Sequence, residues 1–200
     1  MKVLVACEYS GVVRDAFAEK GHDAWSCDIL PTETKGNHIQ DDVLKHLDKD
    51  WDLLIAHPPC TYLSRAGARW LYPKAGQLDK DRYEKGLQGK KFFMQFINAK
   101  IKKIAVENPT PFKIFNLPKP TQAIQPYEYG HNFSKRTLLW LKNLPQLKPT
   151  DIVSEYKPLL PSNTGGKKRG QKLNRGFVHN GKDASKTFKG IAKAMAEQWG

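Results

Sequence analysis

The chain has 200 residues and a mass of 22.7 kDa. This length suits one domain of ordinary size and is too short for two. Its formal net charge of +13 favours a polyanionic partner such as nucleic acid, although a merely soluble basic surface would give the same excess. Three cysteines without CxxC spacing argue against a disulfide framework and a zinc site. With no signal peptide and no apolar run near the ~20 residues of a bilayer span, we expect a soluble cytoplasmic protein.

The first part of the chain alternates between strand-like and helix-like patterns. Residues 3–7 form a nearly continuous apolar run, typical of a strand buried on both faces of a parallel sheet. A turn containing Gly11 follows, and a helical pattern then ends at Gly21. The next expected elements are a strand over 23–27 that ends at Asp28, a segment over 39–47 with Asp42 before a short helix, and a buried strand over 51–56.

The remaining pattern completes an α/β domain. We expect a helix over about 81–100, then strands over 103–106 and 137–141. Strands that alternate with helices imply right-handed crossovers and a mostly parallel sheet, with a ligand crevice at the carboxyl ends of the strands.

The composition changes after Pro145. Prolines and glycines become frequent, and the residues after Tyr156 include ten basic side chains against two acidic ones. From about Ser185 to Trp199 the apolar residues return to helical spacing. We therefore expect a main domain over 1–145, a basic Pro/Gly-rich segment over 146–184, and a helix over 185–200 that packs back on the domain.

Two residues capable of covalent chemistry stand at strand ends. The strand Leu53–Ala56 runs into His57-Pro58-Pro59-Cys60, and the strand that ends at Val106 runs into Glu107. Covalent chemistry on a pyrimidine ring needs a thiol and a carboxylate placed in this way. A loop containing Arg65 would favour the thiolate form of Cys60. The alternatives are a buried, inert Cys60 and a solvated Glu107. We interpret Cys7 and Cys27 as core residues.

Acidic residues at other strand ends suggest a cofactor. The turn after the first strand contains Glu8, Ser10 and Gly11, which alone is a weak signal that a plain strand-to-helix turn also explains. Asp28 lies at the position where an acidic residue binds the ribose hydroxyls in dinucleotide-type folds, and Asp42 lies at a third strand end. The sequence contains no GxGxxG or P-loop pattern. These acidic residues therefore favour an adenosine-bearing cofactor over a phosphate-rich one.

The order of these motifs resembles that of DNA cytosine-5 methyltransferases, most closely the short phage-type members, over about the first three quarters of the chain. The family's Pro-Cys pair matches Pro59-Cys60, and its Glu-Asn-Val matches Glu107-Asn108-Pro109 except at the last residue. Its Gln-x-Arg-x-Arg strand start is matched only at Arg136, in Asn132-x-x-x-Arg136.

The resemblance implies a Rossmann-like class I S-adenosylmethionine-dependent methyltransferase fold and a metal-free mechanism. Cys60 would add to carbon 6 of a flipped-out cytosine in DNA, Glu107 would protonate ring N3, and Arg136 would hold the O2 oxygen. A methyl group from S-adenosylmethionine would then reach carbon 5. The implied cofactor pocket comprises Glu8, Tyr9, Ser10, Gly11, Asp28, Ile29, Asp42, Val43 and Pro59.

The resemblance also implies where DNA would bind. The loop from Ser64 to about Gln77 would close over DNA through Arg65, Arg69 and Trp70, unless it is a plain surface loop whose Trp70 packs on the domain. Phosphate contacts are expected from a later basic patch, although a basic tail without a binding role has the same composition. The patch consists of Lys167, Lys168, Arg169, Lys172 and Arg175.

The chain departs from the family in two respects. Its glycine-rich first motif is reduced to Gly11, and only about 60 residues follow Leu141, so the usual target-recognition domain is missing. We therefore expect a monomer whose sequence selectivity is low or supplied by a partner protein. A modified cofactor, such as a carboxylated S-adenosylmethionine, would give a bulkier cytosine adduct.

Other classes remain open. A methyltransferase that acts on exocyclic nitrogen needs Asp or Asn before its prolines and an aromatic residue after them, where this chain has His57 and Cys60. A degenerate, non-catalytic DNA-binding or decoy protein would not depend on the thiol. RNA or another base is a further alternative substrate.

Overall fold

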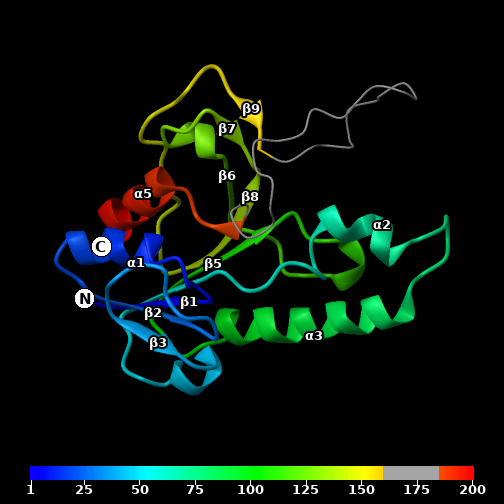
Figure 1. Ribbon diagram of the computed structural model, residues 1–200, viewed down its shortest axis with the longest axis horizontal. Coiled ribbons are helices and arrows are strands. Elements are labelled where there is room, and N and C mark those ends of the chain that lie inside the picture. The colour runs from blue at the N-terminus through cyan, green and yellow to red at the C-terminus, as the bar shows by residue number, and fades with distance from the viewer. Residues whose placement is uncertain (160–184) are drawn as a thin grey trace.

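A seven-stranded sheet in the order β3-β2-β1-β4-β5-β8-β6 forms the centre of the computed structural model, which describes residues 1–159 and 185–200 (Figure 1). Strands β1 to β5 pair in parallel, whereas β8 is antiparallel to both neighbours, β5 and β6. The strands are β1 (Lys2–Ala6), β2 (Asp23–Asp28), β3 (His38–Gln40), β4 (Leu53–Ala56), β5 (Lys103–Pro109), β6 (Gln122–Ile124) and β8 (Thr137–Lys142).

This strand order confirms the predicted α/β fold with a mostly parallel sheet. It is the Rossmann-like order with its reversal between β1 and β4, to which one antiparallel strand, β8, has been added between β5 and β6. In sheets of this kind, ligands bind outside the carboxyl ends of the strands, where the order reverses.

Helices cover both faces of the sheet (Figure 1). Helices α1 (Val12–Glu19) and α5 (Lys189–Trp199) pack together on one face, and α3 (Lys80–Ile97) packs on the other. Alternate residues of each strand point to opposite layers, so both kinds are buried and the strands read as continuous apolar runs. The other elements are α2 (Ala68–Leu71), the short helical turns η1 (Val43–His46), η2 (Arg65–Gly67), η3 (Lys113–Phe115) and η4 (Pro126–Glu128), and a small parallel pair, β7 (Phe133–Ser134) with β9 (Lys157–Pro158).

A buried arginine connects α1 to the loop between β2 and β3. Arg14 is 1% exposed and donates hydrogen bonds to the hydroxyl oxygens of Ser26 (3.1 Å), Thr32 (3.1 Å) and Thr34 (2.6 Å). It also forms an ion pair with Asp15 at 2.7 Å. Because a buried cation needs this many partners, Arg14 fixes the loop against the helix. Nothing in the local sequence pattern predicts this role.

Two parts of the sheet differ from expectation. The three-residue strand β6 was not predicted, and the sequence pattern does not indicate the antiparallel direction of β8. Strand direction depends on the connection between elements, and the segment before β8 contains no helix long enough for a parallel crossover. Among the described helices, none combines the length and apolar character needed to cross a membrane.

Two glycines of α3 provide a test of the packing between this helix and η3. A Cβ on buried Gly86 would overlap the ring of Phe115, which is itself 1% exposed and has no room to move. A Cβ on Gly89 would lie 3.4 Å from Leu63, an ordinary contact. We expect Gly86→Ala to destabilise the protein by about 1–3 kcal/mol through overpacking. The matched control Gly89→Ala is expected to stabilise it by up to about 1 kcal/mol through helix propensity.

Denaturant unfolding of the two variants measures both effects. Equal stability changes in the two variants would contradict the close packing of Gly86 against Phe115.

Candidate active site

The register of the parallel strands aligns the chemically active residues in one row. Ala6 of β1 pairs with Ala56 of β4, which pairs with Val106 of β5. The next residues along these strands are Cys7, His57 and Glu107, so these three stand side by side at the carboxyl edge of the sheet. This edge of the sheet has two halves. The first half lies at β1, β2 and β3, and the second half lies at β4, β5 and β8.

In the first half, the carboxylate of Glu8 caps the N-terminus of α1. Glu8 is 5% exposed and accepts hydrogen bonds from the backbone N–H groups of Val13 (2.7 Å) and Arg14 (3.1 Å). The hydroxyl of Ser10 donates to the same carboxylate at 3.3 Å. A negative side chain therefore already occupies the helix end at which a ligand phosphate would otherwise bind.

Gly11 precedes α1 in a left-handed conformation, with φ of 76°. A Cβ there would overlap Thr34 and Arg14, so glycine lets the loop after β2 approach the helix. The backbone carbonyl of Tyr9 accepts a hydrogen bond from the N–H of Glu33 in the same loop, at 2.9 Å. Glu8, Tyr9, Ser10 and Gly11 therefore form a rigid turn between β1 and α1.

Carboxylates make this half of the edge negative. Cys7, expected in the core, instead lies half-buried at the end of β1 with φ of 57°. Burial raises the pKa of its thiol, and the carboxylates of Asp28 and Asp42 raise it further. In spite of the net charge of +13, the local potential therefore suits a positively charged ligand group.

The residues after these acids differ in exposure. Ile29 is 74% exposed beside Asp28 and offers an apolar surface, whereas Val43 is 4% exposed and belongs to the core. One oxygen of Asp28 accepts from the N–H of Leu30 at 2.9 Å, and one oxygen of Asp42 accepts from the N–H of Leu44 at 3.0 Å. Both carboxylates are thereby held in defined positions at the strand ends.

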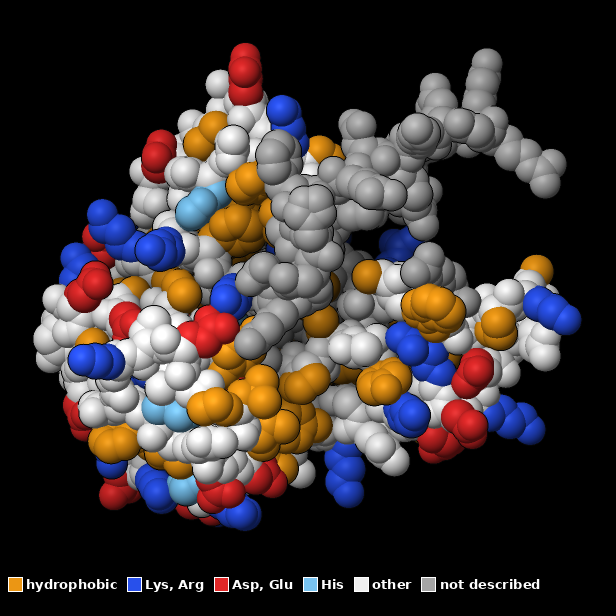
Figure 2. Space-filling model, in the orientation of Figure 1, with side chains coloured by type: hydrophobic (Ala, Val, Ile, Leu, Met, Phe, Trp, Pro, Cys, Tyr) orange, Lys and Arg blue, Asp and Glu red, His pale blue; other side chains and the backbone are white. Residues whose placement is uncertain are grey.

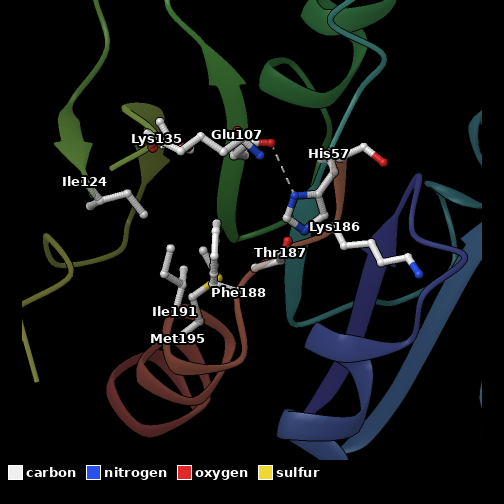
Figure 3. A pocket seen from close by; sticks show the side chains of 11 residues that line it. His57, Glu107, Ile124, Lys135, Lys186, Thr187, Phe188, Ile191 and Met195 are labelled. Atoms are coloured by element: carbon white, nitrogen blue, oxygen red, sulfur yellow. Dashed lines mark hydrogen bonds and ion pairs between the residues drawn. The ribbon is translucent and has the colours of Figure 1, made fainter. Parts of the chain in front are cut away.

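In the second half, Cys60, His57 and Glu107 form a cluster. Nδ1 of His57 lies 3.6 Å from a carboxylate oxygen of Glu107, and the two side chains are 11% and 20% exposed (Figure 3). Nε2 of His57 is buried without a hydrogen-bond partner among the described residues. Cys60 is half-buried after the exposed Pro59, and its thiol lies within the electrostatic influence of Glu107.

The surroundings of Cys60 correct one expectation. The sequence suggested an electropositive loop that favours the thiolate, but burial raises the pKa of the Cys60 thiol and the Glu107 carboxylate raises it further. Lys135 acts in the opposite direction and lowers this pKa. The surroundings of Cys60 therefore disfavour the thiolate.

Lys135, rather than Arg136, accompanies Glu107. A cavity beside Glu107 is lined by His57, Lys135 and Thr137, and by residues 185–188 that precede α5 (Figure 3). Arg136 is exposed and does not line this cavity. Sequence reasoning missed Lys135, which lies between β7 and β8.

The C-terminal segment connects the two halves of the edge. Thr187 and Phe188 line the cavity beside Glu107, while Lys186 forms an ion pair with Glu33 at 2.8 Å in the loop after β2. The segment therefore crosses the carboxyl edge before the chain enters α5.

The residues expected to contact DNA are only partly described. Arg65 is exposed at the start of η2, and Trp70 is 56% exposed in α2. Arg69 belongs to α2, and its side chain is not described. Figure 2 shows Lys and Arg side chains interspersed with Asp and Glu on the visible described surface, rather than gathered in one patch. The remaining residues lie outside the described part of the chain: Lys167, Lys168, Arg169, Lys172 and Arg175.

Known proteins resemble this chain only in structure. No family model matches it, and no curated protein matches its sequence. A candidate DNA modification methyltransferase encoded within an Escherichia coli prophage matches with a TM-score of 0.45 and 17% identity, over 76% of this chain and 51% of that one. A mutant of Spodoptera frugiperda DNMT2 matches with a TM-score of 0.41 and 17% identity, over 82% and 56%. The chain thus spans about half the length of these structures.

The strand order and the strand-end cluster define the class of the protein. It is an α/β protein with a Rossmann-like, mostly parallel sheet, and the carboxyl edge of this sheet carries a thiol and a carboxylate after adjacent strands.

Removal of the Glu107 charge tests the electrostatic contact with Cys60. Because the carboxylate raises the thiol pKa, we expect Glu107→Gln to lower it and to speed alkylation of Cys60 by iodoacetamide roughly several-fold at pH 7.5. In the wild type, the alkylation rate should rise with pH up to a value above the ~8.5 of a free cysteine. Mass spectrometry of the Cys60 peptide follows the reaction, and an unchanged pH profile in Glu107→Gln would contradict the contact.

Proposed function

We propose that the protein is a DNA cytosine-5 methyltransferase-like enzyme that uses S-adenosylmethionine. The observation that carries this proposal is that Cys60 and Glu107 follow adjacent parallel strands, where the Glu107 carboxylate raises the pKa of the Cys60 thiol. A thiol nucleophile beside a carboxyl proton donor suits addition to a pyrimidine ring. The motif order of the sequence supports the same chemistry.

The residues of the first half fit S-adenosylmethionine. Asp28 and Asp42 suit hydroxyl and amino groups, the exposed Ile29 suits an adenine face, and the negative potential at Cys7 suits a sulfonium. Glu8 already caps α1, so the edge is poorly suited to a phosphate-rich cofactor. When bound, S-adenosylmethionine supplies an electrophilic methyl group for carbon 5 of the base.

In the second half, Cys60 and Glu107 would act on the flipped base. The Cys60 thiol passes its proton to the Glu107 carboxylate, the sulfur forms a bond to carbon 6, and Glu107 passes that proton on to ring N3. Carbon 5 becomes nucleophilic and is methylated. A base then removes the carbon 5 proton, the sulfur–carbon bond breaks with return of its electron pair to sulfur, and N3 returns its proton.

His57 would hold Glu107 in position for this proton transfer. The backbone N–H of His57 donates to the carbonyl of Ala6 at 3.0 Å, which fixes the backbone of His57 at the end of β4. With Nδ1 at 3.6 Å from the carboxylate, His57 can orient Glu107 while the opposite oxygen of the carboxyl group faces the base. His57 is thus a positioning residue in the proposal.

The proposal makes DNA the substrate. Three reduced thiols and the basic composition agree with a cytoplasmic enzyme that meets DNA in a bacterial or phage-infected cell. We further propose that the enzyme is a monomer whose sequence selectivity is low or supplied by a partner protein.

Nucleoside mass spectrometry of DNA from cells that express the protein tests the reaction. We expect a new 5-substituted cytosine in wild-type cells, its loss in Cys60→Ala, and its retention in Cys27→Ala, which removes a thiol from the core. The mass of the adduct distinguishes methyl from a carboxylated group. An adduct that persists in Cys60→Ala would contradict the covalent mechanism. Tight DNA binding by soluble protein without any adduct would also contradict it.

Asp28 provides a separate test of the cofactor site. Asp28→Asn keeps the oxygen that accepts from Leu30 but removes the charge, so we expect the Kd for S-adenosylmethionine to rise roughly 10-fold or more. Asp23→Asn, at the opposite end of β2, should change this Kd less than about twofold. Isothermal titration calorimetry measures both constants, and equal effects would argue against a cofactor contact by Asp28.

A further inference from the structure

A second cavity lies outside the candidate active site, between the segment that follows Cys60 and the start of α3. Its volume is about 330 Å³, which falls in the range of roughly 300–1,000 Å³ typical of small-ligand sites. None of the described residues that line it also lines the cavity beside Glu107. Those residues are Tyr62, Trp70, Asp79, Asp81, Arg82 and Lys85. The second cavity is therefore a separate candidate for ligand binding.

Hydrogen bonds hold the walls of this cavity in place. Helix α2, which carries Trp70, lies beside the start of α3 (Figure 1). The backbone N–H of Asp79 donates to the carbonyl of the buried Leu71 at 2.9 Å, which ties the end of α2 to α3. On the other side, Nη2 of Arg82 donates to the carbonyl of Thr61 at 2.9 Å. The cavity therefore has a defined shape.

Aromatic and cationic side chains meet in this cavity. Trp70 is 56% exposed and Tyr62 is 37% exposed, so both present ring surface to a ligand. The guanidinium carbon of Arg82 lies 5.0 Å from the centroid of the Tyr62 ring, and the ammonium nitrogen of Lys85 lies 5.7 Å from it. Proteins bind single-stranded nucleic acid with this combination, because aromatic rings stack on bases and cations attract phosphates.

The two carboxylates of the cavity do not pair with its cations. Among the described residues, neither Arg82 nor Lys85 forms an ion pair with Asp79 or Asp81, although Asp81 and Lys85 are four residues apart on α3. A ligand therefore meets separate donors and acceptors. A nucleotide carries groups for both, because its phosphate accepts from cations and the amino group of its base donates to carboxylates.

The place of Tyr62 in the chain limits which nucleotide can reach the cavity. Tyr62 follows Cys60 by two residues, which span at most about 7 Å. This length equals about two steps of a DNA strand at roughly 3.4 Å each. A base inside a duplex is stacked on both faces, so only an unpaired base can offer a face to Trp70. The cavity thus suits an unpaired nucleotide close to the base that meets Cys60.

We propose that this cavity binds one unpaired nucleotide of the DNA strand that carries the target cytosine. The base stacks on Trp70, and the phosphate lies at Arg82 and Lys85. The proposal rests on the proposed function for the identity of the strand. It adds a preference for single-stranded or locally unpaired DNA, which covalent chemistry on one flipped base does not itself require.

Variants of Trp70 test the base contact without any need for methyl transfer. Fluorescence anisotropy gives the Kd for a fluorescein-labelled, cytosine-containing oligonucleotide, either as a single strand or fully paired in a duplex. We expect Trp70→Ala to raise the Kd for the single strand roughly 10-fold through lost stacking, and the Kd for the duplex less than about twofold. Trp70→Phe keeps a ring and should bind the single strand within about threefold of the wild type. A thermal melt checks the folding of both variants.

Lys85 provides a test of the phosphate contact. Each phosphate contact to a single strand contributes about 0.7 to the slope of log Kd against log salt concentration, so Lys85→Met should lower that slope by about this amount. The matched control is Lys91→Met, because Lys91 is exposed on the same helix, about 9 Å further along its axis and about 120° around it. Lys91→Met should leave the slope unchanged, and Trp70→Ala should weaken binding without changing the slope.

Three results would overturn the proposal. If Trp70→Ala affects single-strand and duplex binding equally, the cavity takes no unpaired base. If Lys85→Met and Lys91→Met change the slope equally, Lys85 makes no specific phosphate contact. If deoxycytidine monophosphate displaces the strand at micromolar concentration, the cavity is a site for a free nucleotide and not for a DNA strand.

The outcomes also separate this proposal from the proposed function. Single-strand binding that depends on Trp70, by a protein that gives no cytosine product, would refute the enzymatic activity and support the nucleotide site. Cytosine product from a protein whose single-strand binding does not depend on Trp70 would refute the nucleotide site and support the enzymatic activity.

Discussion

The parallel pairing of β1, β4 and β5 is the constraint on which the rest of the structure depends. Because Ala6, Ala56 and Val106 are in register, the residues that follow them meet at one edge. Hydrophobic burial on both faces fixes that register, since a slip by one residue would exchange the side chains of the α1 layer and the α3 layer. The chemistry at the edge is therefore a consequence of core packing in the sheet.

The two halves of this edge have different electrostatic characters. Asp28 and Asp42 make the half at β1 and β2 negative, while Lys135 partly offsets Glu107 in the half at β5 and β8. A positively charged cofactor and a base that gains negative charge would thus each meet complementary groups. The overall basicity of the chain concerns long-range attraction to a polyanion and says little about either local site.

Much of this arrangement was predictable from the sequence, for physical reasons. The buried strands of a parallel sheet read as continuous apolar runs, and their carboxyl ends meet, so Cys60 and Glu107 could be expected together. The direction of β8 could not, because it depends on the connection that precedes it. Lys135 was missed because the motif match fell on Arg136, and the protonation of Cys60 was misjudged because burial and Glu107 outweigh nearby basic residues.

Residues 185–188 form one wall of the cavity, so their place in the sequence determines when the cavity is completed during synthesis. These residues and α5, which packs on α1, come from the end of this 200-residue sequence, whereas Cys60 and Glu107 lie far earlier. On the ribosome, the strands that supply the thiol and the carboxylate emerge well before the segment that encloses them. A nascent or truncated chain without residues 185–199 would have the reactive groups but lack one wall of the cavity, so the cavity is enclosed only after α5 has been synthesised.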